Sequence, residues 1–301
     1  MSNVGVKINE VGPRDGLQSE PELLPTASKL EFIRRAVDAG IKRLEVASFV
    51  HPKKVPQMAD AEQLLEQLPS IDDVSYVGLI MNERGLDRAL DTKVHEIGMV
   101  VVATDTYNRR NQGVSTEESI DSWLQIAERA QAHGKIANIM ISSAFGCPFE
   151  GEVEVDRIIE IAEKVLKAGP AELGIADSIG VAVPSQVTEL VRRLRAAFGS
   201  IPLRFHLHNT RNTGLANAQA AVNAGVDSLD SSIGGIGGCP FAPAATGNIP
   251  TDDLIYMMDR SSIETGVSLG KIMETSLWLE QELGRNVPAM LPKAGMFPAM
   301  Q

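Results

Sequence analysis

Two histidines, His206 and His208, stand two residues apart in the predicted β-strand Leu203–His208. Side chains two apart on a strand point to the same side. A pair of imidazoles on one face can bind a divalent metal ion. The alternative is a hydrogen-bonded pair of core histidines. Because the chain has five histidines and these two share a strand and a face, we favour metal ligation.

Arg14 and Asp15 follow the first predicted strand. Asp15 offers a hard oxygen to a cation, and the Arg14 guanidinium offers a fixed positive charge to an oxyanion formed during a reaction. The alternative is a turn in which Asp15 caps backbone N–H groups and Arg14 is a surface charge. Glu45 lies within the apolar strand Leu44–Ser48, where a carboxylate is costly unless it is paired. We interpret Glu45 as the group that orients Arg14, or alternatively as half of a structural ion pair.

A glycine-rich loop, Gly234–Asn248, follows the last predicted strand and contains Cys239. Loops in this position of a barrel often bind phosphate, which is one interpretation. A cysteine within such a loop is poorly suited to packing, and beside a cation and an arginine it would have thiolate character and could move a proton. Asn248 could supply a neutral oxygen to a metal ion. For Cys147 we favour a packing role instead.

One carboxylate, two imidazoles and one amide oxygen make a mixed nitrogen and oxygen site, formed by Asp15, His206, His208 and Asn248. Such a site favours Mg²⁺ or Mn²⁺, with Zn²⁺ or Co²⁺ as alternatives. Octahedral coordination leaves about two positions for substrate oxygens.

Eight short runs rich in Val, Ile and Leu alternate with segments of helical periodicity, and each run precedes small or polar residues. The runs are Val6–Val11, Arg43–Ser48, Ser75–Ile80, Glu96–Ala103, Ala137–Ser143, Glu172–Ala176, Leu203–His208 and Ser228–Ser232. This alternation predicts a (β/α)8 TIM barrel. The rival is a doubly wound open sheet, but Gly12–Gly16 lacks the glycine fingerprint of that fold. In a barrel, the candidate residues would meet at the C-terminal ends of the strands.

We expect one catalytic domain over residues 1–301, with the barrel at about 6–265 and an additional C-terminal helix and tail at about 266–301. The helix is expected at about Ile272–Leu283. The segment Val287–Gln301 contains three prolines, so we expect it to be loose or to form an oligomer contact.

The composition excludes several classes of function. A formal net charge of −11 disfavours nucleic acid as a partner. No apolar run approaches about 18 residues, so we expect no membrane span. Two cysteines fit a reducing compartment, and Met1–Glu10 lacks the pattern of a signal peptide. We therefore expect a cytoplasmic protein.

Three stretches of the sequence closely resemble 3-hydroxy-3-methylglutaryl-CoA lyase (HMG-CoA lyase), a family within the TIM-barrel metallolyase superfamily that includes acyl synthases. They are Glu10–Gln18, Ser48–Lys53 with Val55–Met58, and the glycine loop Gly234–Asn248 with its Gly-Gly-Cys-Pro centre. The stretch Gly146–Gly151 also looks like the family. The cysteine loop is the most specific element, because the acyl synthases typically lack it.

The resemblance implies metal ligands at Asp15, His206, His208 and Asn248. It implies catalytic residues at Arg14, Glu45 and Cys239, with Asp15 and His206 also moving protons. The implied reaction is a retro-Claisen cleavage of 3-hydroxy-3-methylglutaryl-CoA, or a close 3-hydroxy-3-substituted acyl-CoA, to acetyl-CoA and acetoacetate or the matching 3-keto acid. CoA would be part of the substrate, and leucine or branched acyl breakdown is the implied setting. A homo-oligomer, dimer or higher, is also expected.

Two other functions stay open: a Claisen-type acyl synthase or aldolase acting on a 2-oxo acid, and a barrel that binds a CoA ester or a metal ion without turnover. The sequence departs from the family pattern at Thr104–Asn108 and at Asn209–Thr213. Both loops are expected to face the substrate, and Arg211 in particular could select a different acyl group.

Overall fold

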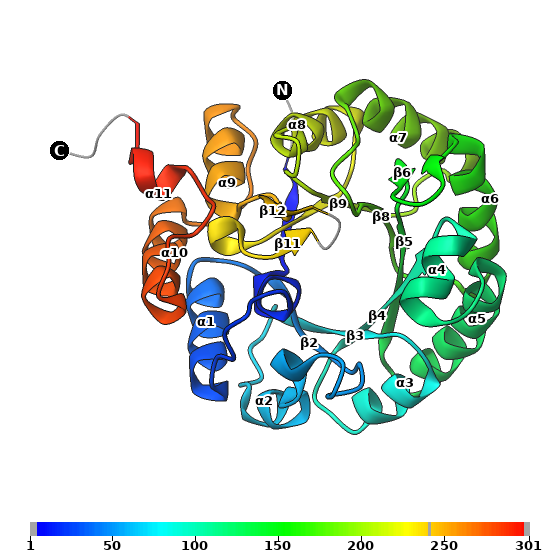
Figure 1. The fold of residues 1–301 in the computed structure, drawn as a ribbon, viewed down its shortest axis with the longest axis horizontal. Helices are drawn as coiled ribbons and strands as arrows, with labels where there is room; N and C mark the ends of the chain where they lie inside the picture. The colour runs from blue at the N-terminus through cyan, green and yellow to red at the C-terminus, as the bar shows by residue number, and fades with distance from the viewer. Residues whose placement is uncertain (1–4, 240–241, 298–301) are drawn as a thin grey trace.

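The computed structural model describes residues 5–239 and 242–297, and within this part a closed barrel of parallel strands forms the centre of the molecule (Figure 1). The strands lie in the order β1-β10-β9-β8-β5-β4-β3-β2. Their bounds are β1 Lys7–Glu10, β2 Arg43–Ser48, β3 Ser75–Ile80, β4 Glu96–Val102, β5 Ile136–Ser142, β8 Leu173–Asp177, β9 Leu203–Leu207 and β10 Ser228–Ser231. All eight predicted strands are confirmed to within one residue at each end, and so is the TIM barrel.

Helices surround the barrel and cover its outer face (Figure 1). They are α1 Thr26–Asp38, α2 Ala61–Gln67, α3 Glu83–Leu90, α4 Asp105–Gln112, α5 Thr116–Ala132, α6 Val155–Val165, α7 Pro184–Phe198, α8 Gly214–Ala224, α9 Thr251–Arg260, α10 Leu269–Leu283 and α11 Leu291–Ala294. A capping box is present at the start of α5, where Ser115 Oγ accepts from the backbone N–H of Glu118 and the Glu118 carboxylate accepts from the backbone N–H of Ser115.

Successive side chains of each strand point alternately outward, into the apolar core beneath the helices, and inward, into the interior of the barrel. On β9, Leu203, Phe205 and Leu207 are at most 1% exposed within the apolar core. Arg204 and His206 lie between them and line the central cavity. The expectation that His206 and His208 share one side therefore holds, because both line that same cavity.

The predicted C-terminal helix is confirmed as α10, which lies beside α1 although the two are far apart in sequence (Figure 1). The Trp278 ring lies 6.2 Å from the ring of Phe32, and the Arg35 guanidinium lies 5.0 Å from the Trp278 centroid. Through these contacts α10 packs on α1 and becomes part of the helical layer around the barrel.

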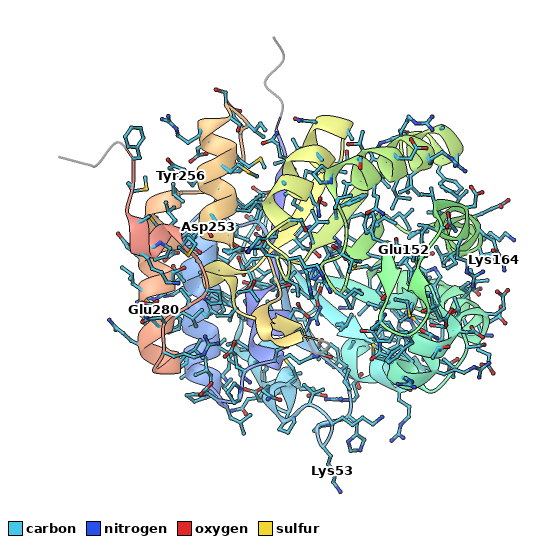
Figure 2. The ribbon with its side chains drawn as sticks, turned by 45° about the horizontal axis from the view of Figure 1, so that its top comes forward. Lys53, Glu152, Lys164, Asp253, Tyr256 and Glu280 are labelled. Atoms are coloured by element: carbon cyan, nitrogen blue, oxygen red, sulfur yellow. The ribbon has the colours of Figure 1, made fainter. Side chains whose placement is uncertain are left out.

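The expectation of a loose tail is wrong for the described part of Val287–Gln301. Val287, Ala289 and Leu291 are buried. The carboxylates of Asp253 on α9 and Glu280 on α10, both labelled in Figure 2, accept hydrogen bonds from backbone N–H groups of this segment. The tail therefore packs on α9 and α10. Prolines interrupt the few apolar residues of the tail, so the sequence shows no periodicity from which this packing could be predicted.

Among residues 5–239 and 242–297, no helix has the length and apolarity needed to cross a lipid bilayer.

Candidate active site

A cavity of about 1010 Å³ opens at the C-terminal ends of the barrel strands, and several charged side chains line it. Arg14 and Asp15 reach it from η1 (Gly12–Gly16), the turn that follows β1. Glu45 reaches it from β2 and His206 from β9, with His208 directly after β9. Residues from three separate strands thus converge, as a barrel requires.

Arg14 is held from two sides by carboxylates. Its guanidinium forms a very short ion pair with Glu45 and another with Asp15 at 2.7 Å between Nη1 and Oδ1. Burial lowers the pKa of Arg14, but Glu45 and Asp15 outweigh it and keep the pKa above its ordinary value. The predicted pair of Arg14 and Glu45 is therefore present, and it fixes a permanent positive charge in the cavity floor.

Asp15, His206 and His208 form a cluster in which one ligand atom from each lies within 4.8 Å of the others. The Nε2 atoms of the two imidazoles are 3.1 Å apart. The fourth predicted ligand, Asn248, lies beside the cluster, since its Nδ2 donates to Asp15 Oδ2 at 2.9 Å. The structure thus brings all four predicted metal ligands together.

The charges of this cluster suit a cation. Burial raises the pKa of Asp15, but Arg14, His206 and Asn248 reverse this and hold it at about 2. Burial and the neighbouring His206 lower the pKa of His208 to about 3. At neutral pH Asp15 is therefore an ionised oxygen ligand, and His208 is a neutral imidazole with a free lone pair.

Two further observations test whether the residues fit a divalent ion. The side-chain oxygen of Asn248 is buried and has no hydrogen-bond partner in the described part of the chain. The polar interior of the barrel carries three guanidiniums against five carboxylates, a formal excess of two negative charges. These groups are Arg14, Arg43 and Arg204 with Asp15, Glu45, Glu96, Glu172 and Asp230. An orphaned oxygen donor and this charge excess both fit a divalent cation.

The glycine loop approaches the cluster very closely. Gly237 has φ +103°, and a Cβ there would lie 2.5 Å from Asn248 Nδ2. A Cβ on Gly16 would lie 2.6 Å from a side-chain carbon of Ile236. Only glycine fits at these two positions, because the loop after β10 rests directly on the turn that carries Asp15.

Cys239 is the last residue of β11 (Gly238–Cys239), which pairs antiparallel with β12 (Ala242–Thr246) in a short hairpin (Figure 1). Gly238, its neighbour, lines the cavity. The Cys239 side chain itself lies outside the described part of the structure. Cys147 is buried and accepts a hydrogen bond from Thr104 Oγ1 at 3.0 Å, which agrees with the packing role predicted for it.

Only one of the two departing loops contributes to the described cavity wall. Tyr107 on α4 lines the cavity, whereas no residue of 209–213 is among the described lining residues. Arg211 Nη1 instead donates to the backbone oxygens of Ile179 and Gly180 at 2.8 and 3.1 Å. One nitrogen of the Arg211 guanidinium thus holds a neighbouring loop, and a role of Arg211 in substrate selection stays a prediction.

Two buried carboxyl groups near the site were missed by the sequence analysis. Asp230 on β10 lies 3.2 Å from Nδ1 of His206. Glu10, at the end of β1, accepts hydrogen bonds from the backbone N–H groups of Gly12 and Ile233 and from Thr251 Oγ1. The reasoning applied to Glu45, that a carboxylate in a buried strand needs a partner, would have found both.

Comparison with known proteins agrees with this geometry. The model of the HMGL-like family matches residues 5–278. The chain is 40% identical to (R)-citramalyl-CoA lyase of Chloroflexus aurantiacus, covering 96% of this chain and 95% of the relative. It is 37% identical to a hydroxymethylglutaryl-CoA lyase of Bacillus subtilis, covering 94% and 95%.

A solved structure has the same fold throughout. The HMG-CoA lyase of Acinetobacter baumannii, in complex with coenzyme A and 3-methylmalate, has a TM-score of 0.95 at 36% identity and covers 100% of this chain and 98% of its own. These similarities confirm the family and the class of enzyme predicted from the motifs. The chain belongs to the HMGL-like family, and it is related over nearly its whole length to enzymes that cleave carbon–carbon bonds.

Proposed function

We propose that this protein is a divalent-metal-dependent lyase that cleaves a 3-hydroxy-3-methyl acyl-CoA by a retro-Claisen reaction. The products are acetyl-CoA and an oxo acid. The observation that carries the proposal is the joint arrangement of Arg14 and the Asp15, His206 and His208 cluster on one cavity floor. Relatives named for such substrates support it.

The chain's own residues account for the proton and charge movements that the cleavage needs. The tertiary hydroxyl at C3 loses its proton to Asp15 or His206, the C2–C3 bond breaks, and its electron pair moves into the thioester as an enolate. The Arg14 guanidinium, held by Glu45, stabilises that oxyanion. The enolate carbon then takes a proton from the Cys239 thiol, which completes acetyl-CoA.

Asp15, His206, His208 and Asn248 are the residues proposed to hold the cation. Mg²⁺ or Mn²⁺ suits the mixed oxygen and nitrogen donors, with Zn²⁺ or Co²⁺ as alternatives. When bound, the ion supplies Lewis-acid chemistry that lowers the pKa of the substrate hydroxyl. Dialysis against a chelator tests this directly: acetyl-CoA release should stop and should return on addition of Mg²⁺ or Mn²⁺. Undiminished turnover after complete metal removal would refute the proposal.

Two substrates fit the proposal. 3-Hydroxy-3-methylglutaryl-CoA would yield acetoacetate, whereas (R)-citramalyl-CoA, which is shorter by one methylene, would yield pyruvate. The second candidate is favoured by the 40% identity to an enzyme named for it, and the 3-methylmalate in a neighbour's structure is a C5 branched hydroxy diacid of matching size. Acetyl-CoA release from each thioester, compared as kcat/KM, separates the two.

The proposal extends to the setting of the enzyme. We propose one catalytic domain that works as a homo-oligomer in the cytoplasm on an acyl-CoA substrate. A synthase or aldolase that acts on a 2-oxo acid remains the alternative. Incubation with acetyl-CoA and a panel of 2-oxo acids tests it, because a synthase would release free CoA thiol and the proposed lyase would not.

A further inference from the structure

Three neighbouring strands place Asn9, Asp230 and His206 side by side inside the barrel. Asp230 is the register partner of Asn9 on β1 and of His206 on β9. Its Oδ1 accepts from Asn9 Nδ2 at 3.1 Å, and its Oδ2 lies 3.2 Å from His206 Nδ1. The Arg204 Nε atom lies 3.8 Å from Oδ1. Asn9, Asp230 and Arg204 thus adjoin the metal-ligand cluster through His206.

Both oxygens of the Asp230 carboxyl group are engaged, Oδ1 by Asn9 Nδ2 and Oδ2 by His206 Nδ1. A carboxylate accepts hydrogen bonds, so this 3.2 Å contact is a hydrogen bond when His206 Nδ1 carries the proton. In the neutral ring this arrangement leaves the lone pair on Nε2, the atom that lies 3.1 Å from His208 Nε2.

The two imidazoles differ in this respect. The Nδ1 atom of His208 is buried and has no hydrogen-bond partner in the described part of the chain. No described carboxylate hydrogen-bonds to the His208 ring, whereas Asp230 contacts Nδ1 of His206. The two predicted ligands therefore differ, because only the His206 ring is held by a hydrogen-bond partner at Nδ1.

We propose that Asp230 is a positioning residue that fixes the tautomer and the ring orientation of His206 for divalent cation binding. The proposal rests on the proposed metal-dependent function. A carboxylate behind a metal-binding histidine raises the basicity of the ligand and holds its ring, and its loss typically costs about 10- to 100-fold in metal affinity. His206 is thus the ligand around which the centre is organised, and His208 is the adaptable one.

A rival explanation is that Asp230 merely adds one negative charge to the interior. Glu96 offers a matched control for it. Its side chain is 7% exposed in the same polar layer, where it pairs with Arg43 and hydrogen-bonds to Ser75 and Asn138. Glu96→Gln removes one interior charge as Asp230→Asn does, but leaves the hydrogen bond to His206 intact.

The test measures Mn²⁺ binding to the metal-free full chain by electron paramagnetic resonance, for the wild type and both variants. We expect a loss of about 10- to 100-fold in affinity for Asp230→Asn and a clearly smaller loss for Glu96→Gln. Equal losses in the two variants, or wild-type affinity in Asp230→Asn, would overturn the proposal. Thermal unfolding of each metal-free variant checks that it is folded.

A second measurement needs no variant. Nitrogen-15 shifts of labelled histidines in the metal-free wild type should report the Nδ1–H tautomer for His206. A His206 that carries its proton on Nε2 would overturn the role of Asp230 even if the protein binds metal. Failure of the wild type to bind Mn²⁺ would instead contradict the proposed function, so the two ideas fail by different results.

Discussion

Asn248 and Asp15 are joined by a hydrogen bond of 2.9 Å although 233 positions separate them in the chain. Asp15 follows the first barrel strand, and Asn248 follows the hairpin that succeeds the last one. The bond therefore forms where the sheet closes on itself, between β1 and β10. The closure of the barrel thus brings these two candidate ligands together.

Substitutions in the pair of Arg14 and Glu45 should be strongly non-additive. Arg14→Lys cannot hold the same fork between two carboxylates, and we expect kcat to fall about 10²- to 10³-fold. Glu45→Gln should lower kcat less, because the guanidinium remains but is no longer held. In the double variant the combined loss should be smaller than the product of the single losses, since each removes the same arrangement. Steady-state kinetics on all four proteins measures this, and multiplicative losses would argue against an orienting role of Glu45.

Cys239→Ser should lower kcat strongly while substrate binding survives, because a hydroxyl is a much weaker acid than a thiol. Cys147→Ser is the matched control. Cys147 is buried against Thr104 and is not among the described residues that line the cavity, so its substitution should leave kcat near the wild-type value. Turnover and equilibrium binding of a CoA thioester are the measurements. A Cys239→Ser enzyme with wild-type kcat, or equal effects at both cysteines, would remove Cys239 from the proton transfer.

His208→Ala should weaken metal retention by about 10-fold or more, because one nitrogen donor of the centre is lost. Elemental analysis after gel filtration gives the metal content, and the exposed His133 provides a control as His133→Ala. Unchanged metal content in the His208 variant would show that this imidazole is not a ligand.

Glu10 should make the protein less stable as pH rises. Burial raises its pKa from 4.5 to about 8, and the hydrogen bonds from Ile233, Thr251 and Gly12 offset this only in part. Below pH 4.5 the group is protonated in both the folded and the unfolded states and costs nothing. Between pH 4.5 and 8 the unfolded chain releases the proton and the folded chain keeps it, so stability falls across this window.

Glu10→Gln removes this titration and keeps a side chain of the same shape. The free energy of unfolding of the variant, relative to the wild type, should therefore increase as pH rises from 4.5 to 8. Urea unfolding at several pH values, in the presence of a chelator, gives this difference. A difference that is constant with pH would show that Glu10 does not titrate in this window.

The strands and four of the site residues could be predicted from sequence because their signals are local. A short apolar run between turn residues predicts a strand. Because His206 and His208 are two residues apart on such a strand, they are predicted to share a side. Glu45 was found by the cost of a lone carboxylate in an apolar strand, and Arg14 as its partner from the ends of adjacent strands.

Other features could not be predicted because they depend on how the barrel closes. Strand periodicity says that Arg204 and Asp230 face inward, but the register between β9 and β10 decides that Asp230 meets His206. The contacts of Arg211 with two backbone oxygens of a neighbouring loop could not be predicted, because they depend on how the two loops pack. The tail has no helical period, so its packing on α9 and α10 arises from tertiary contacts alone.

The central claim is that one divalent cation binds between Asp15, His206, His208 and Asn248. Crystals of the protein grown with Mn²⁺, with anomalous diffraction collected above the manganese edge, test it most directly. The account predicts a single strong anomalous peak within bonding distance of a carboxylate oxygen of Asp15 and of the Nε2 atoms of both imidazoles. A peak elsewhere in the molecule, or an empty cluster in crystals of protein that turns over substrate, would contradict it.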